Sequence, residues 1–148
     1  MKISNPQVRG FYAGLLAGVI GGIPVTIARI IQEMLKLPTE VPGILSVETV
    51  VYHISYEMGL VGIFGAIFGI FYSRFYPGLP SKGVKKGFIF SLIIGFFSNI
   101  WWTSSNFLKW LLTGKLQFLW WSFEFAYTYI VIFPLYGVIL GVVYERWK

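Results

Sequence analysis

The chain has 148 residues, of which 56% are hydrophobic, 20% aromatic and only 12% charged. In soluble domains about a quarter of the residues are charged, so this composition excludes an ordinary soluble protein and predicts an all-α, polytopic membrane protein. The formal net charge of +6 comes from bases scattered at the ends of apolar segments, which excludes the continuous basic surface of a nucleic-acid-binding protein.

Cysteine and aspartate are both absent, and all six acidic residues are glutamates. Disulfides, thiolate metal ligands and an aspartate-based triad are therefore unavailable. One histidine remains, with Glu, Ser and Tyr, for acid-base or nucleophilic chemistry. We therefore expect a protein that is not an enzyme and that holds no metal or cofactor.

Four apolar segments are long enough to cross the hydrocarbon core, which takes about 20 helical residues. They run from Arg9 to Leu35, from Val47 to Tyr72, from Lys86 to Leu112 and from Phe118 to Tyr144. Short connections with Pro and Gly separate them, as is typical of turns. The sequence predicts one domain, residues 1–148, with four transmembrane helices.

Basic residues are concentrated on one side of these four spans. The N-terminus, the second connection and the C-terminus share that side, which holds eight of the twelve bases: Lys2, Arg9, Arg74, Lys82, Lys85, Lys86, Arg146 and Lys148. Because Lys and Arg near span ends are retained in the cytoplasm, we expect both termini on the cytoplasmic side of the cell membrane. Lys82, Lys85 and Lys86 are expected to contact anionic lipid headgroups, although an ordinary positive-inside loop has the same composition.

An internal repeat underlies the four segments. RGFYAGLLAG in the first and KGFIFSLIIG in the third match at an offset of 77 residues, and GAIFGIFYSRF in the second and GVILGVVYERW in the fourth match at an offset of 72. We predict two tandem, parallel helical hairpins, residues 9–76 and 86–148, related by an axis along the membrane normal. Chance matching among glycine-rich apolar helices is the alternative.

Small residues recur at every fourth position of these segments. In lipid, such rows let helix backbones approach closely, because packing replaces hydrophobic burial as the driving force. The residues expected to pack helices together are Gly14, Gly18, Gly22, Gly65, Gly69, Gly95, Gly137 and Gly141.

The chain's one histidine lies in VYHISYEMG, four residues before Glu57. At about 100° per residue, His53 and Glu57 share a helix face, whereas Glu48 lies about 140° from His53, which excludes a three-ligand metal site. Helical rise places Glu57 below the outer surface, with Arg29 within about one turn of it in depth. Arg29 is therefore the expected counter-ion, since an unpaired charge there costs about 2.5 to 3.5 kcal/mol.

These residues belong to a predicted polar cluster in the extracytoplasmic half of the membrane. Its expected members are Arg29, Gln32, Glu33, His53, Glu57, Thr103 and Asn106. The alternative is that the long side chains simply extend to the interface and have no further role.

Two functions are consistent with these features. One is a transporter or channel-like protein in which Glu57 or His53 changes charge during passage. The other is a non-catalytic scaffold or accessory subunit of a membrane complex. Both the polar face and the small-residue face of the second segment need cover, which predicts a homo-oligomer or a membrane-complex partner.

Three stretches of the sequence suggest a family. GLLAGVIGG near the start, EVP after the first segment, and the second segment with its histidine and its ending RFYPGLPSKGVKKGF resemble the YagU-like four-helix inner-membrane proteins. The resemblance covers about half of the chain and implies a polytopic inner-membrane protein of unsettled activity that is associated with acid tolerance. The chain lacks that family's longer first loop, and no site residue is carried over.

Overall fold

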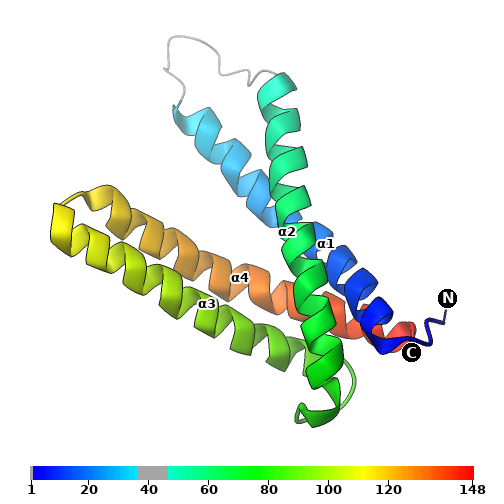
Figure 1. The fold of residues 1–148 in the computed structure, drawn as a ribbon. Helices are drawn as coiled ribbons and strands as arrows, with labels where there is room; N and C mark the ends of the chain where they lie inside the picture. The colour runs from blue at the N-terminus through cyan, green and yellow to red at the C-terminus, as the bar shows by residue number, and fades with distance from the viewer. Residues whose placement is uncertain (1, 37–46) are drawn as a thin grey trace.

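The computed structural model describes residues 2–36 and 47–148, except for the side chains of residues 28, 29, 32–36, 49, 53, 57 and 117–129. This part of the chain is all-helical (Figure 1). The elements in chain order are α1 (Pro6–Lys36), α2 (Val47–Phe75), the short 3-10 helix η1 (Tyr76–Gly78), α3 (Val84–Thr113) and α4 (Leu116–Arg146).

The prediction of four helices is confirmed, and each predicted span lies inside one of them. Within the described residues, three helical stretches are long and apolar enough to cross a membrane, namely Pro6–Ile27, Val50–Gly78 and Val84–Thr113. α4, predicted as the fourth span, is 31 residues long. The coarse fold is therefore a helical protein with at least three segments suited to a bilayer.

Local sequence signals mark two helix ends. Asn5 caps the start of α1, because its side-chain oxygen accepts hydrogen bonds from the backbone N–H groups of Gln7 and Val8 at 2.9 and 3.3 Å. This arrangement satisfies two of the donors that a helix start leaves unpaired. Gly114 ends α3 in the left-handed conformation, at a φ of 65°, and its N–H donates to the Trp110 carbonyl at 2.8 Å. Glycine adopts that φ without a Cβ clash.

α1 and α2 form a first hairpin whose backbones touch. Gly10, Gly14 and Gly18 on α1 face Gly65 and Gly69 on α2. A Cβ added at Gly14 would overlap the carbonyl oxygen of Gly65 and would lie 2.7 Å from the Cα of Gly69. No side chain fits between the helices here, so the two backbones pack directly against each other.

This seam loosens away from the chain ends. A Cβ added at Gly22 would lie 3.5 Å from the Cα of Met58, which is an ordinary van der Waals contact. A Cβ added at Gly59 would meet nothing within 4 Å among the described atoms. The closest helix approach therefore lies in the half of the hairpin that contains Gly10 and Gly14.

α3 and α4 form a second hairpin with a similar seam. A Cβ at Gly87 would lie 2.7 Å from the Cα of Gly141, and a Cβ at Gly137 would lie 2.7 Å from the Cβ of Ser91. Gly95 is buried on the same side of α3. Ser91 replaces a glycine in this row at little cost, since its hydroxyl donates to the Phe88 carbonyl of its own helix at 2.8 Å.

The two hairpins meet where α1 packs on α4, and they diverge from there (Figure 1). Both ends of the chain and the connection that contains η1 lie at the converging end, where the backbone N–H of Ile3 donates to the Trp147 carbonyl at 3.0 Å. The buried apolar cluster gathers toward this end and consists of Ala13, Ala17, Tyr72, Phe90, Tyr136, Leu140 and Tyr144.

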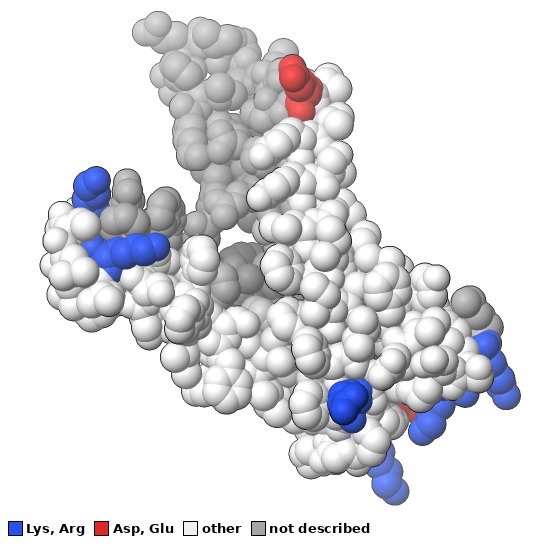
Figure 2. Space-filling view, in the orientation of Figure 1, with Lys and Arg blue, Asp and Glu red and all other residues white. Residues whose placement is uncertain are grey.

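Most of the visible Lys and Arg residues lie at this converging end, which we call the basic end (Figure 2). Its exposed bases are Lys2, Arg74, Lys82, Lys85, Arg146 and Lys148. The opposite tips, the far ends of the hairpins, carry Glu48 on the first hairpin and Lys109 and Lys115 on the second. The visible charged residues therefore lie at the two ends of the helices.

We expect Gly14→Ala to destabilise the protein by about 1 to 3 kcal/mol, because the new methyl group forces the α1 and α2 backbones apart. Gly59→Ala is the matched control: its methyl group enters open space, and the higher helix propensity of Ala is worth up to about 1 kcal/mol in its favour. Reversible unfolding in mixed micelles measures both. Equal stability of the two variants would contradict the backbone contact.

Candidate functional site

Five members of the predicted polar cluster, Arg29, Gln32, Glu33, His53 and Glu57, have side chains outside the described part of the structure. The expected pairing of Arg29 with Glu57 lies outside it for the same reason. The remaining two members, Thr103 and Asn106, lie on α3 in the half toward the far end of the second hairpin.

Thr103 and Asn106 belong to a row of polar side chains on α3. The Thr103 hydroxyl donates to the Asn99 side-chain oxygen, one turn earlier, at 3.3 Å. Asn106 is only 2% exposed, and its amide nitrogen has no hydrogen-bond partner among the described atoms. It lies on the same side of α3 as the buried Ser91 and Gly95. An unpaired buried amide carries a desolvation cost of about 1 to 3 kcal/mol, so this residue stands out as a candidate site.

A second cluster, at the basic end, was not predicted as a site from the sequence. We call it the joint, and its members come from all four helices and η1: Arg9, Tyr72, Tyr76, Lys86, Tyr144 and Glu145.

Three tyrosine rings form the centre of the joint. The Tyr72 and Tyr144 rings meet edge to face, with centroids 5.0 Å apart, and Tyr76 lies 5.5 Å from Tyr72 and 5.1 Å from Tyr144. Phe90 of α3 closes one side, 5.3 Å from Tyr72. Aromatic pairs of this kind add about 0.5 to 1.5 kcal/mol each beyond their buried area. The ring cluster thus ties α2 directly to α3 and α4.

Cations cover these rings. The Arg9 guanidinium lies 5.1 Å from the Tyr144 ring centroid, and the Lys86 and Lys148 ammonium groups lie 4.2 and 5.2 Å from that of Tyr76. Such contacts contribute about 0.5 to 1 kcal/mol when exposed and about 2 when desolvated. Arg9 and Lys86 are buried at 7% and 9% exposure, so they bind inside the protein instead of facing outward.

Backbone carbonyls satisfy these two buried cations. Arg9 donates to the Ile3 carbonyl from Nε at 3.1 Å and from an Nη at 2.6 Å, and Lys86 donates to the Tyr76 carbonyl at 2.6 Å. The Arg9 contact holds residues 2–5 against the basic end, beside the bond between Ile3 and Trp147.

One carboxylate lies among these cations. The Tyr76 hydroxyl donates to the Glu145 carboxylate, which joins η1 to the end of α4. Three cations and this one carboxylate thus contact the tyrosine side chains among the described residues. The Tyr72 hydroxyl is buried and has no hydrogen-bond partner among the described atoms.

The repeat contained a signal for the joint. Tyr72 and Tyr144 occupy matching positions in the second and fourth segments, and Arg9 and Lys86 match in the first and third. Polar residues that recur at the same ends of repeated helices can meet if the repeats converge there. From the sequence alone, these residues were predicted only as the ends of the four spans, and a contact among them was not predicted.

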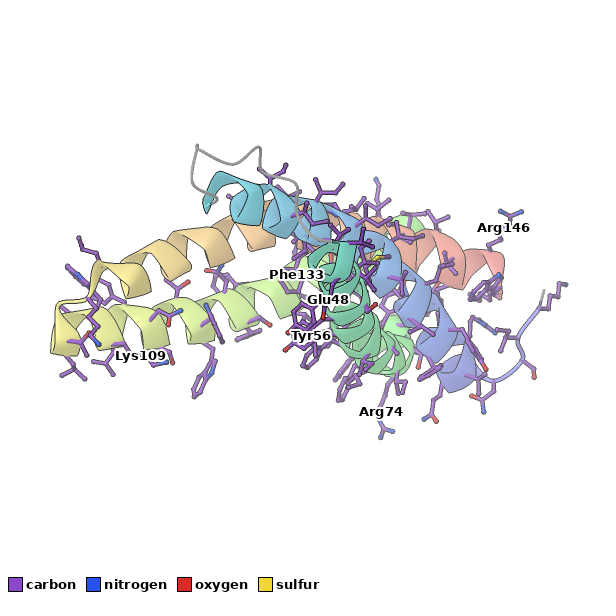
Figure 3. All side chains as sticks on the ribbon, turned by 90° about the horizontal axis from the view of Figure 1, so that it is seen from above. Glu48, Tyr56, Arg74, Lys109, Phe133 and Arg146 are labelled. Carbon is purple, nitrogen blue, oxygen red and sulfur yellow. The ribbon has the colours of Figure 1, made fainter. Side chains whose placement is uncertain are left out.

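The three lysines expected to contact lipid headgroups differ in position. Lys82 and Lys85 are exposed on the connection and the first turn of α3, whereas Lys86 is buried against Tyr76. Arg74 and Arg146 project away from the joint at the outside of the basic end (Figure 3). The contact of Lys82 and Lys85 with headgroups stays a prediction, and the Lys86 charge lies inside the protein.

Deeper in the molecule, Tyr136 of α4 links the two hairpins. Its side chain is 7% exposed and its hydroxyl donates to the backbone carbonyl of Gly65 on α2 at 2.9 Å. Its Cβ also lies 3.8 Å from the position of a Cβ built on Gly21 of α1. Tyr136 therefore contacts both helices of the first hairpin where α4 crosses it.

We expect Tyr136→Phe to lower the free energy of unfolding by about 0.6 kcal/mol and by at most about 1.7 kcal/mol, the average and the maximum for interhelical hydrogen bonds in a membrane protein. Tyr12→Phe removes the same hydroxyl from a side chain that is 46% exposed, and it should leave stability unchanged. Unfolding of both variants in the same micelles measures the difference. A Tyr136→Phe protein as stable as the Tyr12→Phe protein would contradict a stabilising bond to Gly65.

Comparison of the chain with protein-family models, curated proteins and solved structures finds no match. Two features of the described residues could serve a function: the polar row that ends at Asn106, and the joint at the basic end.

Proposed function

We propose that the protein is a non-catalytic scaffold or accessory subunit of a membrane complex, which packs against further transmembrane helices. The glycine seams carry this proposal. Gly14, Gly65 and Gly137 contact the neighbouring helix of their own hairpin, so these glycine rows are not available to line a pathway. Large apolar side chains face outward instead, such as Ile63 on α2 and Phe97 on α3, at 60% and 66% exposure.

The divergence of the hairpins also supports a scaffold. Their contact is concentrated near the basic end, and their far ends stand apart (Figure 1). Ile27 on α1 and Ile130 on α4, in the diverging halves, are 52% and 69% exposed. A transmembrane helix from a second copy or from another protein would cover such surfaces, and in lipid its packing would depend on close side-chain fit.

In this proposal the basic end faces the cytoplasm of the cell membrane, with both chain termini on that side. The bases exposed at this end, against Glu48 at the far end of the first hairpin, support that orientation by the positive-inside rule. Lys82 and Lys85 would contact anionic headgroups, at about 1 kcal/mol per charge.

The two hairpins are proposed to be tandem repeats. In support, the contacting pair Gly10 and Gly69 of the first hairpin is related to the contacting pair Gly87 and Gly141 of the second by the two offsets found in the sequence. The contact between Tyr72 and Tyr144, which occupy equivalent positions, is what an axis passing between the repeats would produce.

Site-specific photo-crosslinking tests the scaffold. A photoreactive residue is placed at Ile63 or at Phe97 and is activated in intact membranes. We expect protein adducts, either of a second copy or of one other membrane protein, because these faces pack on helices. The same residue at Lys82, at the basic end, is the control for random collision.

Mass spectrometry of the adducts identifies the partner. Adducts with lipid alone at both Ile63 and Phe97, together with particles that hold one chain in nanodiscs of native lipid, would contradict the proposal. Equal yields of protein adducts at all three positions would also count against it, since this result indicates collision.

Asn106 favours a second candidate, a transporter or channel-like protein. A buried amide without a partner among the described atoms, one turn beyond the hydrogen bond between Thr103 and Asn99, is the kind of polar group that marks a substrate path inside a membrane. The charge would come from the other members of the predicted polar cluster, above all from Glu57.

Asn106→Leu separates the two candidates. Replacing an unpaired buried amide by an apolar group of similar size should leave the free energy of unfolding unchanged or raise it by about 1 kcal/mol or more. A transporter with this site would lose ion or solute flux in reconstituted vesicles while remaining folded. Unchanged flux, or the absence of flux in the parent protein, would exclude the transport candidate.

A further inference from the structure

The contacts between the hairpins differ in kind from those within them. Within each hairpin, backbone packs on backbone at Gly14 and Gly65 or at Gly87 and Gly141. Such contacts cannot slide without a clash, because packed interiors have discrete arrangements. Each hairpin is therefore a rigid body.

Between the hairpins, polar and aromatic contacts at the joint predominate at the basic end. The bond from Tyr76 to Glu145 and the stacking of Arg9 on Tyr144 lie beside the exposed bases of that end. Tyr76 and Glu145 are partly exposed, so water and lipid headgroups can compete for the bond between them, whereas Tyr72 and Tyr144 are buried. The bond from Tyr76 to Glu145 is therefore the part of the joint at which opening would begin.

The closed joint also contains opposing interactions. The aromatic contacts and the bond from Tyr76 to Glu145 hold it together. Against them, the Tyr72 hydroxyl is buried without a hydrogen-bond partner among the described atoms. An unpaired buried hydroxyl lowers the stability of the closed arrangement.

We propose that the joint is a releasable latch between two rigid hairpins, and that its state sets the separation of their far ends. The crossing at Tyr136, which bonds to Gly65 and packs against Gly21, lies between the latch and the far ends and acts as the pivot. Two rigid bodies that turn about such a point transmit a small change at one end to the other. The latch does not depend on whether the protein is a scaffold or a transporter.

Distances between spin labels test the latch. The chain has no cysteine, so labels attach specifically at introduced ones. One pair spans the hairpins at their far ends, Val51→Cys on α2 with Leu111→Cys on α3, at positions 54% and 59% exposed. A second pair lies within the first hairpin, Ile23→Cys on α1 with Leu60→Cys on α2.

Two variants open the latch without removing a ring. Tyr76→Phe deletes the hydroxyl that bonds Glu145, and Glu145→Gln removes the carboxylate charge. In lipid nanodiscs we expect both to broaden the distance distribution between the hairpins or to add a second peak to it, while the distance within the hairpin stays the same. Arg146→Gln is the matched control, since Arg146 neighbours Glu145 but projects away from the joint (Figure 3).

Two results would overturn the latch. The first is an unchanged distribution between the hairpins in both variants. The second is a change in the distances within and between the hairpins together, because this indicates loss of fold and not release of a joint. A broadening that Arg146→Gln reproduces would count against the latch as well, since it would follow from surface charge alone.

Discussion

The structure depends on one constraint, the direct contact of helix backbones at glycine. In a bilayer the hydrophobic effect does not draw helices together, because lipid tails are as apolar as the side chains. Helix association therefore depends on close packing. At Gly14 and Gly65, and again at Gly87 and Gly141, the chain omits the side chains that would hold two helices apart. The two hairpins exist as units because of these positions, and the remaining surface of each helix is free to carry large residues.

A division of roles along the molecule follows from this constraint. Glycine packing occupies the helix faces within each hairpin, so the two hairpins contact each other through polar and aromatic side chains. Tyr136 supplies a hydroxyl at the crossing, and the joint supplies rings, cations and one carboxylate at the basic end. The burial of Arg9 and Lys86 fits this arrangement, because a ring face and a backbone carbonyl together replace the water that each cation loses.

The sequence was a good guide to whatever depends on local pattern. Hydropathy located all four helices, and each predicted span lies inside the corresponding element. Of the glycines named from their spacing, Gly14, Gly65, Gly137 and Gly141 lie at the two seams, since a row at every fourth position faces one way on a helix. Gly10 and Gly87, which also lie there, were missed. Lys86 shows the limit: its spacing from Lys82 and Lys85 suggests a headgroup contact, but its direction is decided by a tyrosine ring ten residues earlier in the chain.

The repeat places the residues of the joint at matching helix ends, but whether they meet, and how far the hairpins diverge, depends on the angle at which α1 meets α4. That angle has no periodic signature in the sequence. The predicted polar cluster was derived only from the depth of its residues in the membrane. Depth brings residues to one level of the membrane without saying which of them meet, and of that cluster the described structure contains Thr103 and Asn106, side by side on one helix.

The pairing of the early and late parts of the chain at the basic end has a consequence for biosynthesis. Ile3 bonds the backbone of Trp147, and Arg9 stacks on Tyr144, so residues near the start of α1 wait for partners that the ribosome makes after almost all of α4. The first hairpin can close its glycine seam during translation, whereas Arg9 can contact Tyr144 only after almost all of α4 has been made. The order of synthesis therefore favours closure of the first hairpin before its contacts with α4 form.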